Sequence, residues 1–375
     1  MIPRQTTARA RGMRRGMPHS ALRRTSQLVQ SLRAMRSGPT FAVLVLLLVV
    51  AVFVNAGVGA VRVPPVEVAT VLLDRIGIST GVEVDVVREQ VVWGIRMPRI
   101  VLAVCVGAGL GMAGASLQAI FRNPLAEPGL IGVSSGGALG VIVLIITGFS
   151  PLGWMSLPLA AFAGALLLTL VVYGLARSDG RTQVVTLILT GVAMNSIAGG
   201  LIGLASFLAN DAELRSIVFW TLGSLAGATW SAVLPVALIT VVGLLLLPRY
   251  ARAMNLIVLG EREAFHLGVS TERVRLLVIV LVTLVAGAGV AVAGIVVFVG
   301  LVVPHLLRIV IGPDHRVLLP ASALGGAILL LGADLVARTI VVPAELPLGV
   351  VTALIGGPYF LFLLRRTTRE QGGWL

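Results

Sequence analysis

Side chains that could act as metal ligands, nucleophiles or proton carriers are sparse in this chain. Its four histidines, His19, His266, His305 and His315, are far apart in the sequence, and Cys105 is the single cysteine. Metal sites need several His, Cys or carboxylate ligands at characteristic spacings, so the pattern predicts no metal site. Nucleophiles and bases do not occur together in the apolar segments either, which argues against an intramembrane enzyme.

Lysine is absent, and all 29 basic residues are arginine. A Walker A loop uses a lysine to contact the phosphates of a bound nucleotide. We therefore expect this chain to bind no cofactor and to be no enzyme. Any ATP hydrolysis that it depends on must come from a separate polypeptide.

Asp334 is the one acidic residue that falls within a predicted span. An ionisable side chain there is a functional candidate by default, and one interpretation is the proton site of a stand-alone proton-coupled secondary transporter. Arg338 follows four residues later, at a spacing that places two side chains on one face of a helix. We favour an ion pair between these two residues.

Residues 122–138 combine prolines, glycines and helix-capping polar groups between two apolar runs. Non-helical backbone at membrane depth is tolerated only where it is buried in protein or lines a cavity. The stretch therefore predicts a re-entrant break between two spans, and not a plain turn.

A charged loop at residues 259–270 is a candidate surface for binding a partner protein. Ala264, Phe265 and Leu267 predict a short amphipathic helix, and Gly268 is placed to end it. An apolar helix exposed in a charged loop usually marks a partner surface; the alternative is a helix that covers its own bundle. We expect His266 to be a surface residue.

Membrane-spanning helices are the elements that must position these residues. The chain is 57% hydrophobic and 12% charged, which is outside the range of soluble domains. Apolar runs of about 20 residues, enough to cross about 30 Å of hydrocarbon, recur nearly from end to end. They are continuous, without the alternation of barrel strands. The sequence predicts an all-α polytopic integral membrane protein with about ten transmembrane helices.

The ten predicted spans cover residues 41–60, 97–119, 129–147, 153–176, 183–208, 229–248, 275–298, 300–311, 317–337 and 346–364. The span at 300–311 is too short to cross alone, and we expect Pro304 to break it. Residues 61–95 form a partly helical outer loop, and residues 209–228 are expected to form a second one that contains a short surface helix.

Arginine distribution predicts the orientation. With the N-terminal tail inside, 22 arginines fall on the inner side and seven on the outer side, which agrees with the positive-inside rule and places both termini in the cytoplasm. The predicted domains are an Arg-rich tail at residues 1–40, a transmembrane domain at 41–366 and a cytoplasmic tail at 367–375.

The tail also explains the net charge of +13, because nine arginines and no acidic residue lie in the first 40 positions. Such a tail before a first span sets topology and contacts membrane lipid, and we do not expect nucleic acid as a partner. Its arginine pairs raise the possibility of a twin-arginine export signal, but the following apolar run lies far downstream and is long for a cleavable segment.

Several stretches resemble one known family. Arg96-Met97-Pro98-Arg99 together with residues 122–138 resembles the signature of the iron-siderophore, haem and vitamin B12 family of ABC importer permeases. Residues 300–305, 332–338 and 344–353 look like the same family, in the same order. The resemblance covers roughly residues 90 to 366 and leaves the Arg-rich tail outside.

The resemblance implies a fold, a function and partners. The fold is the type II permease fold of ABC importers, in which two permeases pair as a homodimer or heterodimer around a central pathway. The partners are cytoplasmic ATPase subunits, which use ATP and magnesium, and an extracytoplasmic substrate-binding protein. The function is to pass an iron-siderophore complex, or a haem- or cobalamin-like chelate, across the bacterial cytoplasmic membrane, and the residues do not choose among these chelates.

The resemblance also implies roles for individual residues. The loop helix resembles the coupling helix that docks on the ATPase, and the coupling residues are Gly260, Glu261, Ala264, Phe265, Leu267, Gly268 and Val269. Arginines on the outer side match those that bind carboxylates of the binding protein, namely Arg96, Arg99 and Arg338; the alternative is that they reach lipid phosphates.

Two further groups complete the expected sites. The cytoplasmic gate lies near the start of the fifth span, with Thr182, Val184, Val185 and Thr186, and Asn195 in the same span is expected to line the pathway. The re-entrant signature consists of Asn123, Pro124, Glu127, Pro128, Gly129, Gly132, Ser134, Ser135 and Gly136.

Overall fold

The computed structural model describes residues 19–178 and 181–370, most of which are helical. The first half of the chain contains α2 (His19–Gly57), α3 (Pro65–Arg75), α4 (Val86–Gln90), a π-helical turn η1 (Val91–Arg96), α5 (Met97–Ile120), η2 (Pro128–Ile131), α6 (Val133–Thr147), η3 (Gly153–Met155), α7 (Ser156–Leu175), the strand pair β1 (Arg177–Ser178) and β2 (Arg181–Thr182), and α8 (Val184–Leu208). The second half contains α9 (Asp211–Leu222), α10 (Trp230–Leu246), η4 (Leu247–Tyr250), α11 (Ala251–Leu259), α12 (Glu261–His266), α13 (Thr271–Ala293), α14 (Val299–Ile311), α15 (His315–Thr339) and α16 (Leu348–Glu370).

The number of spans agrees with the sequence. Within the described residues, seven helices are long and apolar enough to cross a membrane, and three shorter apolar helices bring the set to ten. The shorter ones are Val133–Thr147, Val299–Ile311 and Leu348–Phe362. The predicted all-α polytopic fold with about ten transmembrane helices is confirmed.

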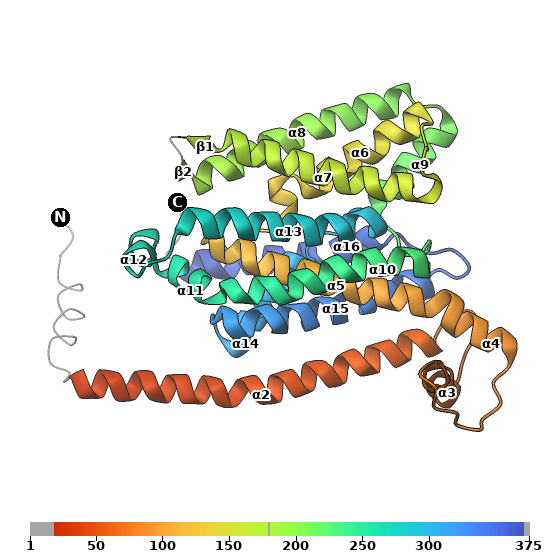
Figure 1. Ribbon diagram of the computed structural model, residues 1–375, viewed down its shortest axis with the longest axis horizontal. Helices are drawn as coiled ribbons and strands as arrows, with labels where there is room; N and C mark the ends of the chain where they lie inside the picture. Colours follow the sequence, from red (N-terminus) through yellow and green to blue (C-terminus); the bar gives the residue numbers. More distant parts are fainter. Residues whose placement is uncertain (1–18, 179–180, 371–375) are drawn as a thin grey trace.

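The long helices run side by side, with α2 along one edge of the bundle and α7 and α8 along the opposite edge (Figure 1). Helix α12 and the β1–β2 pair lie at one end, whereas α3, α4 and α9 lie at the other (Figure 1). The predicted outer loops do contain short helices. Helix α9 begins with a capping box in which Asn210 and Glu213 bond each other's backbone N–H groups.

Helix α5 is buried along most of its length and packs closely against α15. A Cβ atom added at Gly111 would lie 2.1 Å from the carbonyl oxygen of Ser322, and one added at Gly107 would lie 2.4 Å from that of Gly326. Small residues at such positions let two helix backbones approach within van der Waals contact, which is the main source of helix association in lipid. The α5–α15 pair is therefore the tightly packed centre of the bundle.

The expectation that Pro304 breaks its span is wrong, because α14 runs continuously through it. Proline lacks the N–H that would bond the carbonyl four residues earlier, which here is that of Gly300. That carbonyl accepts a hydrogen bond from Nε2 of Gln118 at 3.3 Å instead. The break lies earlier, at residues 294–298, between α13 and α14.

The predicted terminal tails are only partly covered by the structure. Residues 1–18, a little under half of the predicted Arg-rich tail, and residues 371–375 lie outside the described residues. Helix α2 begins at His19 and continues without interruption into the first span, which starts at Ser37. The second half of the predicted tail is thus the beginning of a transmembrane helix.

The α5–α15 contact makes a prediction about stability. The substitution Gly111→Ala should lower the free energy of unfolding by about 1–3 kcal/mol, because the added methyl group meets backbone that cannot move aside. Thermal unfolding of the detergent-solubilised protein, followed by the fraction that stays monodisperse, measures the effect. Gly174→Ala on α7 is the matched control, since nothing lies within 4 Å of a Cβ there. Equal stability of the two variants would contradict the close packing.

Candidate functional site

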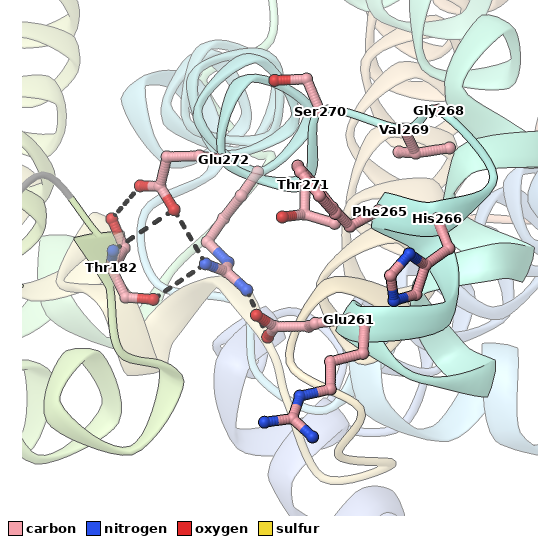
Figure 2. A pocket seen from close by; sticks show the side chains of 11 residues that line it. Thr182, Glu261, Phe265, His266, Gly268, Val269, Ser270, Thr271 and Glu272 are labelled. Atoms are coloured by element: carbon pink, nitrogen blue, oxygen red, sulfur yellow. Dashed lines mark hydrogen bonds and ion pairs between the residues drawn. The ribbon is translucent and has the colours of Figure 1, made fainter.

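A cleft of about 960 Å³ lies at the end of the bundle that carries α12. Its lining comes from α12, from the loop and first turn of α13, and from Thr182 at the end of β2 (Figure 2). Glu261, Glu272 and Arg275 contribute charged groups to this lining, and Phe265 contributes an aromatic ring. The loop predicted to be a partner surface is therefore one wall of an open cleft.

Helix α12 confirms the predicted short helix within residues 259–270. Its apolar residues divide between two faces: Ala264 is 0% exposed, whereas Phe265 and Leu267 are 70% and 65% exposed. His266 is exposed as well, as expected. Ala264 anchors the helix to the bundle, and the two large apolar side chains remain available to a partner.

Glycines mark both ends of α12. Gly268 has φ of 82°, its N–H donates to the carbonyl of Phe265 at 2.9 Å, and the N–H of Val269 donates to the carbonyl of Ala264 at 3.0 Å. This is the Schellman arrangement, in which a left-handed residue ends a helix, and it confirms the predicted terminator. Gly260 precedes the helix with φ of 149°. The direction of α12 is thus determined at each end by a backbone conformation that favours glycine.

Arg275 links the cleft to the segment before α8. Its guanidinium is 2% exposed and donates to Glu261 at 2.6 Å, to Glu272 at 3.0 Å and to the backbone carbonyl of Thr182 at 2.8 Å. Glu272 also accepts hydrogen bonds from the hydroxyl and backbone N–H of Thr182 (Figure 2). The hydroxyl of Tyr173 donates to the same carboxylate at 3.1 Å. The network joins α12, α13, β2 and α7.

Sequence reasoning identified Glu261 and Thr182 but missed Glu272 and Arg275 as site residues. Their opposite charges at i and i+3 in the first turn of a helix were an available signal. Arg275 was interpreted only as an indicator of topology. The carboxylate of Glu272 is the group that connects the two predicted sites.

The predicted gate residues lie at the start of α8 in differing environments. Thr182 is buried, at 4% exposure, whereas Val185 is 70% exposed. Val184 and Thr186 are partly buried, and the Thr186 hydroxyl donates to Gln183 at 3.2 Å. Only Val185 therefore presents a large apolar side chain outward at this level of α8.

Asn195 connects the middle of α8 to the re-entrant break. Its Nδ2 donates to the carbonyl of Gly129 at 3.0 Å, and its Oδ1 accepts from the hydroxyl of Ser135. It also lines a cavity of about 320 Å³ between the two breaks of the bundle. A pathway role for Asn195 stays a prediction, and its bonds give it a structural role as well.

A break is present between α5 and α6, as predicted, but it ends at Gly132 and not at residue 138, because residues from Val133 onward form the first turns of α6. The side chain of Asn123 accepts from the N–H of Leu125 at 2.9 Å and so forms an Asx turn. Gly132 adopts φ of 90° at the start of α6. The other signature residues either line the cavity, as Glu127, Pro128, Gly129, Ser134 and Ser135 do, or lie elsewhere in the break, as Pro124 does, or pack against α7, as Gly136 does.

Two of the predicted docking arginines cap the end of α2. Arg96 is 6% exposed and donates to the carbonyl oxygens of Ala56 and Val61. Arg338 donates to the carbonyl of Asn55 at 2.6 Å. The last carbonyls of a helix lack intrahelical partners, and cationic side chains satisfy them well. These arginines therefore attach α2 to the bundle, and docking through them stays a prediction.

The third arginine, Arg99, binds two carboxylates. Its Nε lies 2.9 Å from Asp334, and its terminal nitrogens make a two-pronged contact with Glu345 at 3.0 and 2.9 Å. Arg338 approaches Asp334 at 3.7 Å, so the predicted pair exists, but Arg99 is the closer partner. Sequence reasoning missed this partner because it lies on another helix.

Comparisons with known proteins decide the family. Residues 47–366 match the FecCD transport family. The chain belongs to this family. FecCD relatives include the hemin transport permease HmuU of Yersinia pestis, 44% identical over 286 residues that make up 75% of this chain and 85% of the relative. The cobalamin import permease BtuC of Halobacterium salinarum is 45% identical over 285 residues, 74% of each chain.

A solved structure resembles this FecCD chain closely. It is an inward-facing metal-chelate type ABC transporter, with a TM-score of 0.77 and 34% sequence identity, covering 88% of this chain and 99% of that one. PsaBC from Streptococcus pneumoniae shares the fold at a TM-score of 0.52 and 17% identity.

FecCD membership identifies the chain as a multi-pass permease of the ABC importers for metal chelates, haem and vitamin B12. Permeases of this kind are not themselves enzymes, and they work with ATPase and substrate-binding partners. A stand-alone secondary transporter with Asp334 as proton site is not favoured, because the chain belongs to a family of ABC importer permeases.

Removing the buried acid should destabilise the fold. Asp334→Ala leaves two arginines with fewer partners in a buried site, and we expect a loss of about 3–5 kcal/mol in unfolding free energy. Glu89→Ala is the control, because its pair with Arg75 is 43% exposed on each side and should contribute about 0–1 kcal/mol. Thermal melts of both variants measure the difference, and similar melting temperatures would refute a structural role for Asp334.

Proposed function

We propose that this chain is the subunit through which an ABC importer passes a ferric-siderophore complex, or a chelate of the haem or cobalamin class, into a bacterial cell. The observation that carries the proposal is the pair of exposed apolar side chains at the end of α12: Phe265, which lines an open cleft at one end of the bundle, and Leu267, which follows the helix as its C-cap. Such a surface is suited to bind a protein that converts ATP hydrolysis into movement.

The cytoplasmic partner in this proposal is a pair of ATPase subunits that supply all nucleotide chemistry. Phe265 and Leu267 enter a groove of the ATPase, and Gly260 and Gly268 hold α12 at the angle that this requires. The absence of lysine from the chain supports the separation of roles, because no Walker A loop can be formed. ATP and magnesium then bind the partner, and this chain binds no cofactor of its own.

The outer partner is a substrate-binding protein with acidic docking surfaces. Arg99 offers a planar guanidinium already arranged for two-pronged carboxylate contact. Arg62 and Arg215 add exposed positive charge from the segment after α2 and from α9. Both chain termini then lie in the cytoplasm, on the side of α12.

The pathway in this proposal lies between α8 and a second permease, either an identical copy or a related chain. Helix α8 exposes a row of apolar side chains at Val185, Leu189 and Val192, with exposed fractions of 70%, 63% and 50%. An apolar row on one helix face is what pairing with another protein surface or a bulky chelate requires. The metal is cargo held by its chelator and recognised through shape.

The transport proposal is tested by reconstituting the chain with its ATPase and binding protein. ATP-dependent uptake of a ferric siderophore, haem or cobalamin into vesicles is the expected result, with the unchelated metal as the control. Uptake of free metal ions in preference to every chelate would overturn the cargo class, and failure to bind any ATPase would overturn the importer role.

Leu267→Asp should abolish binding of the ATPase subunit while the bundle stays folded. The substitution places a charge in an apolar contact, and we expect a loss of affinity of about 2–4 kcal/mol. Co-purification of the ATPase measures it. Val87→Asp on α4 is the control, since Val87 is 62% exposed at the opposite end. Normal association of the Leu267 variant would contradict the role of α12.

Docking of the binding protein makes Arg99 and Glu345 respond in opposite ways. Arg99→Glu should weaken capture at least about tenfold. Glu345→Gln should strengthen binding of the substrate-binding protein by about 0.5–1 kcal/mol, because the loss of the carboxylate charge frees the guanidinium of Arg99 for the partner. Surface plasmon resonance at two salt concentrations measures both. If the Glu345 variant weakens capture as much as the Arg99 variant, the pair is purely structural.

A further inference from the structure

The segment between α7 and α8 is bound at both ends to one carboxylate. Tyr173, in the last turns of α7, and Thr182, just before α8, donate their hydroxyls to Glu272 on α13. The backbone N–H of Thr182 donates to the same carboxylate at 3.3 Å. A displacement of the first turn of α13 therefore carries with it the start of α8.

The same turn of α13 is tied to α12 through Arg275. This side chain is 2% exposed, and its Nε has no hydrogen-bond partner. A buried charge that loses a partner is strongly destabilised, so its bonds to Glu261, Glu272 and the Thr182 carbonyl resist being broken one at a time. Helix α12 and Thr182 are thus held to one guanidinium, as the convergent dashed lines of Figure 2 show.

Helix α8 has few other polar ties to the bundle near this end. Its next polar tie to the bundle is Asn195, which bonds Gly129 and Ser135. Close backbone contact occurs at Gly191, where an added Cβ would lie 2.0 Å from the carbonyl oxygen of Leu130. Between Thr182 and this contact, Val185 and Leu189 project outward, whereas Leu187 is 1% exposed and packs in the core. The first turn of α8, which carries Val185 and ends at Leu187, can therefore move with Thr182 while the middle of the helix stays in place.

We propose that Glu272 and Arg275 are positioning residues that transmit the displacement of α12 to the start of α8 and so move Val185. The inference rests on the proposed function, because it takes α12 as the surface on which the ATPase acts. Neither residue touches cargo or nucleotide. Their role is to make two segments, separated in the sequence by the whole of α8 to α11, move as one body.

The test uses the complete transporter in lipid nanodiscs, with spin labels at Val185→Cys and Arg316→Cys in a Cys105→Ala background. Arg316 is exposed in the first turn of α15, whose middle packs on α5. Pulsed electron paramagnetic resonance measures the distance between the two spin labels with and without ATP. Transport of chelate per ATP hydrolysed is measured in vesicles.

Two variants weaken the link at different points. Glu272→Ala removes the shared carboxylate, and Thr182→Val removes one hydroxyl with little change of shape. We expect Glu272→Ala to lose most of the ATP-dependent change in distance and to transport about tenfold less chelate per ATP hydrolysed, as loss of coupling between two sites predicts. Thr182→Val keeps its carbonyl bond to Arg275 and should lose part of both. Thr182→Ser should behave as wild type because it retains the hydroxyl.

Arg273→Ala is the matched control, since Arg273 lies in the same turn of α13 and is exposed. The inference is overturned if Glu272→Ala and Thr182→Val keep the wild-type ratio of transport to ATP hydrolysis. It is equally overturned if transport falls only in proportion to thermal stability while the ATP-dependent distance change persists. Failure of the unmodified chain to bind an ATPase would instead refute the proposed function.

Discussion

The close approach of α5 and α15 is the constraint on which the rest of the molecule depends. Backbone carbonyls of α15 occupy the space where side chains at Gly107 and Gly111 would stand. Packing this close leaves no room for one helix to shift against the other. In lipid it is stabilised by van der Waals contact and not by the hydrophobic effect. The centre of the bundle therefore acts as a fixed frame, and relative movement must occur in the elements around it.

Arginine ion pairs and hydrogen bonds at the two ends of the bundle determine which surrounding elements can move separately. At one end, Arg99 joins α5 to Asp334 on α15 and to Glu345 before α16, all within the frame. At the other end, Arg275 joins α12 to the start of α8, which is outside the frame. Arg99 thus strengthens the fixed part, and the buried Arg275 connects two peripheral parts to each other.

Much of this organisation was predictable because the bilayer restricts what a chain can do. Apolar runs long enough to cross hydrocarbon gave the helices within a few residues, and the α12 helix followed from three apolar side chains and Gly268. The break between α5 and α6 followed from its prolines and glycines. These features depend on local sequence, where side-chain type and spacing carry the information.

The errors and omissions all involve partners distant in the sequence. Pro304 was expected to break its helix, because no local feature indicates that Gln118 would satisfy the carbonyl of Gly300. Arg338 was predicted as the partner of Asp334 from helical spacing, whereas the closer partner is Arg99. The i,i+3 pair of Glu272 with Arg275 was a local signal, but the bonds of Glu272 to Tyr173 on α7 and Thr182 on β2 were not predictable for the same reason. Tertiary contacts between helices override local patterns at these positions.

A chain built as a fixed frame with peripheral moving parts should do no work without a partner. The most direct test is accumulation of a labelled chelate against its gradient in vesicles that contain either this chain alone or the chain with its ATPase and binding protein. We expect uphill accumulation only in vesicles that contain the chain with its ATPase and binding protein. It should also require ATP on the side of the membrane where α12 lies. Uphill accumulation by the chain alone, abolished by a protonophore, would contradict this result and establish a self-sufficient transporter.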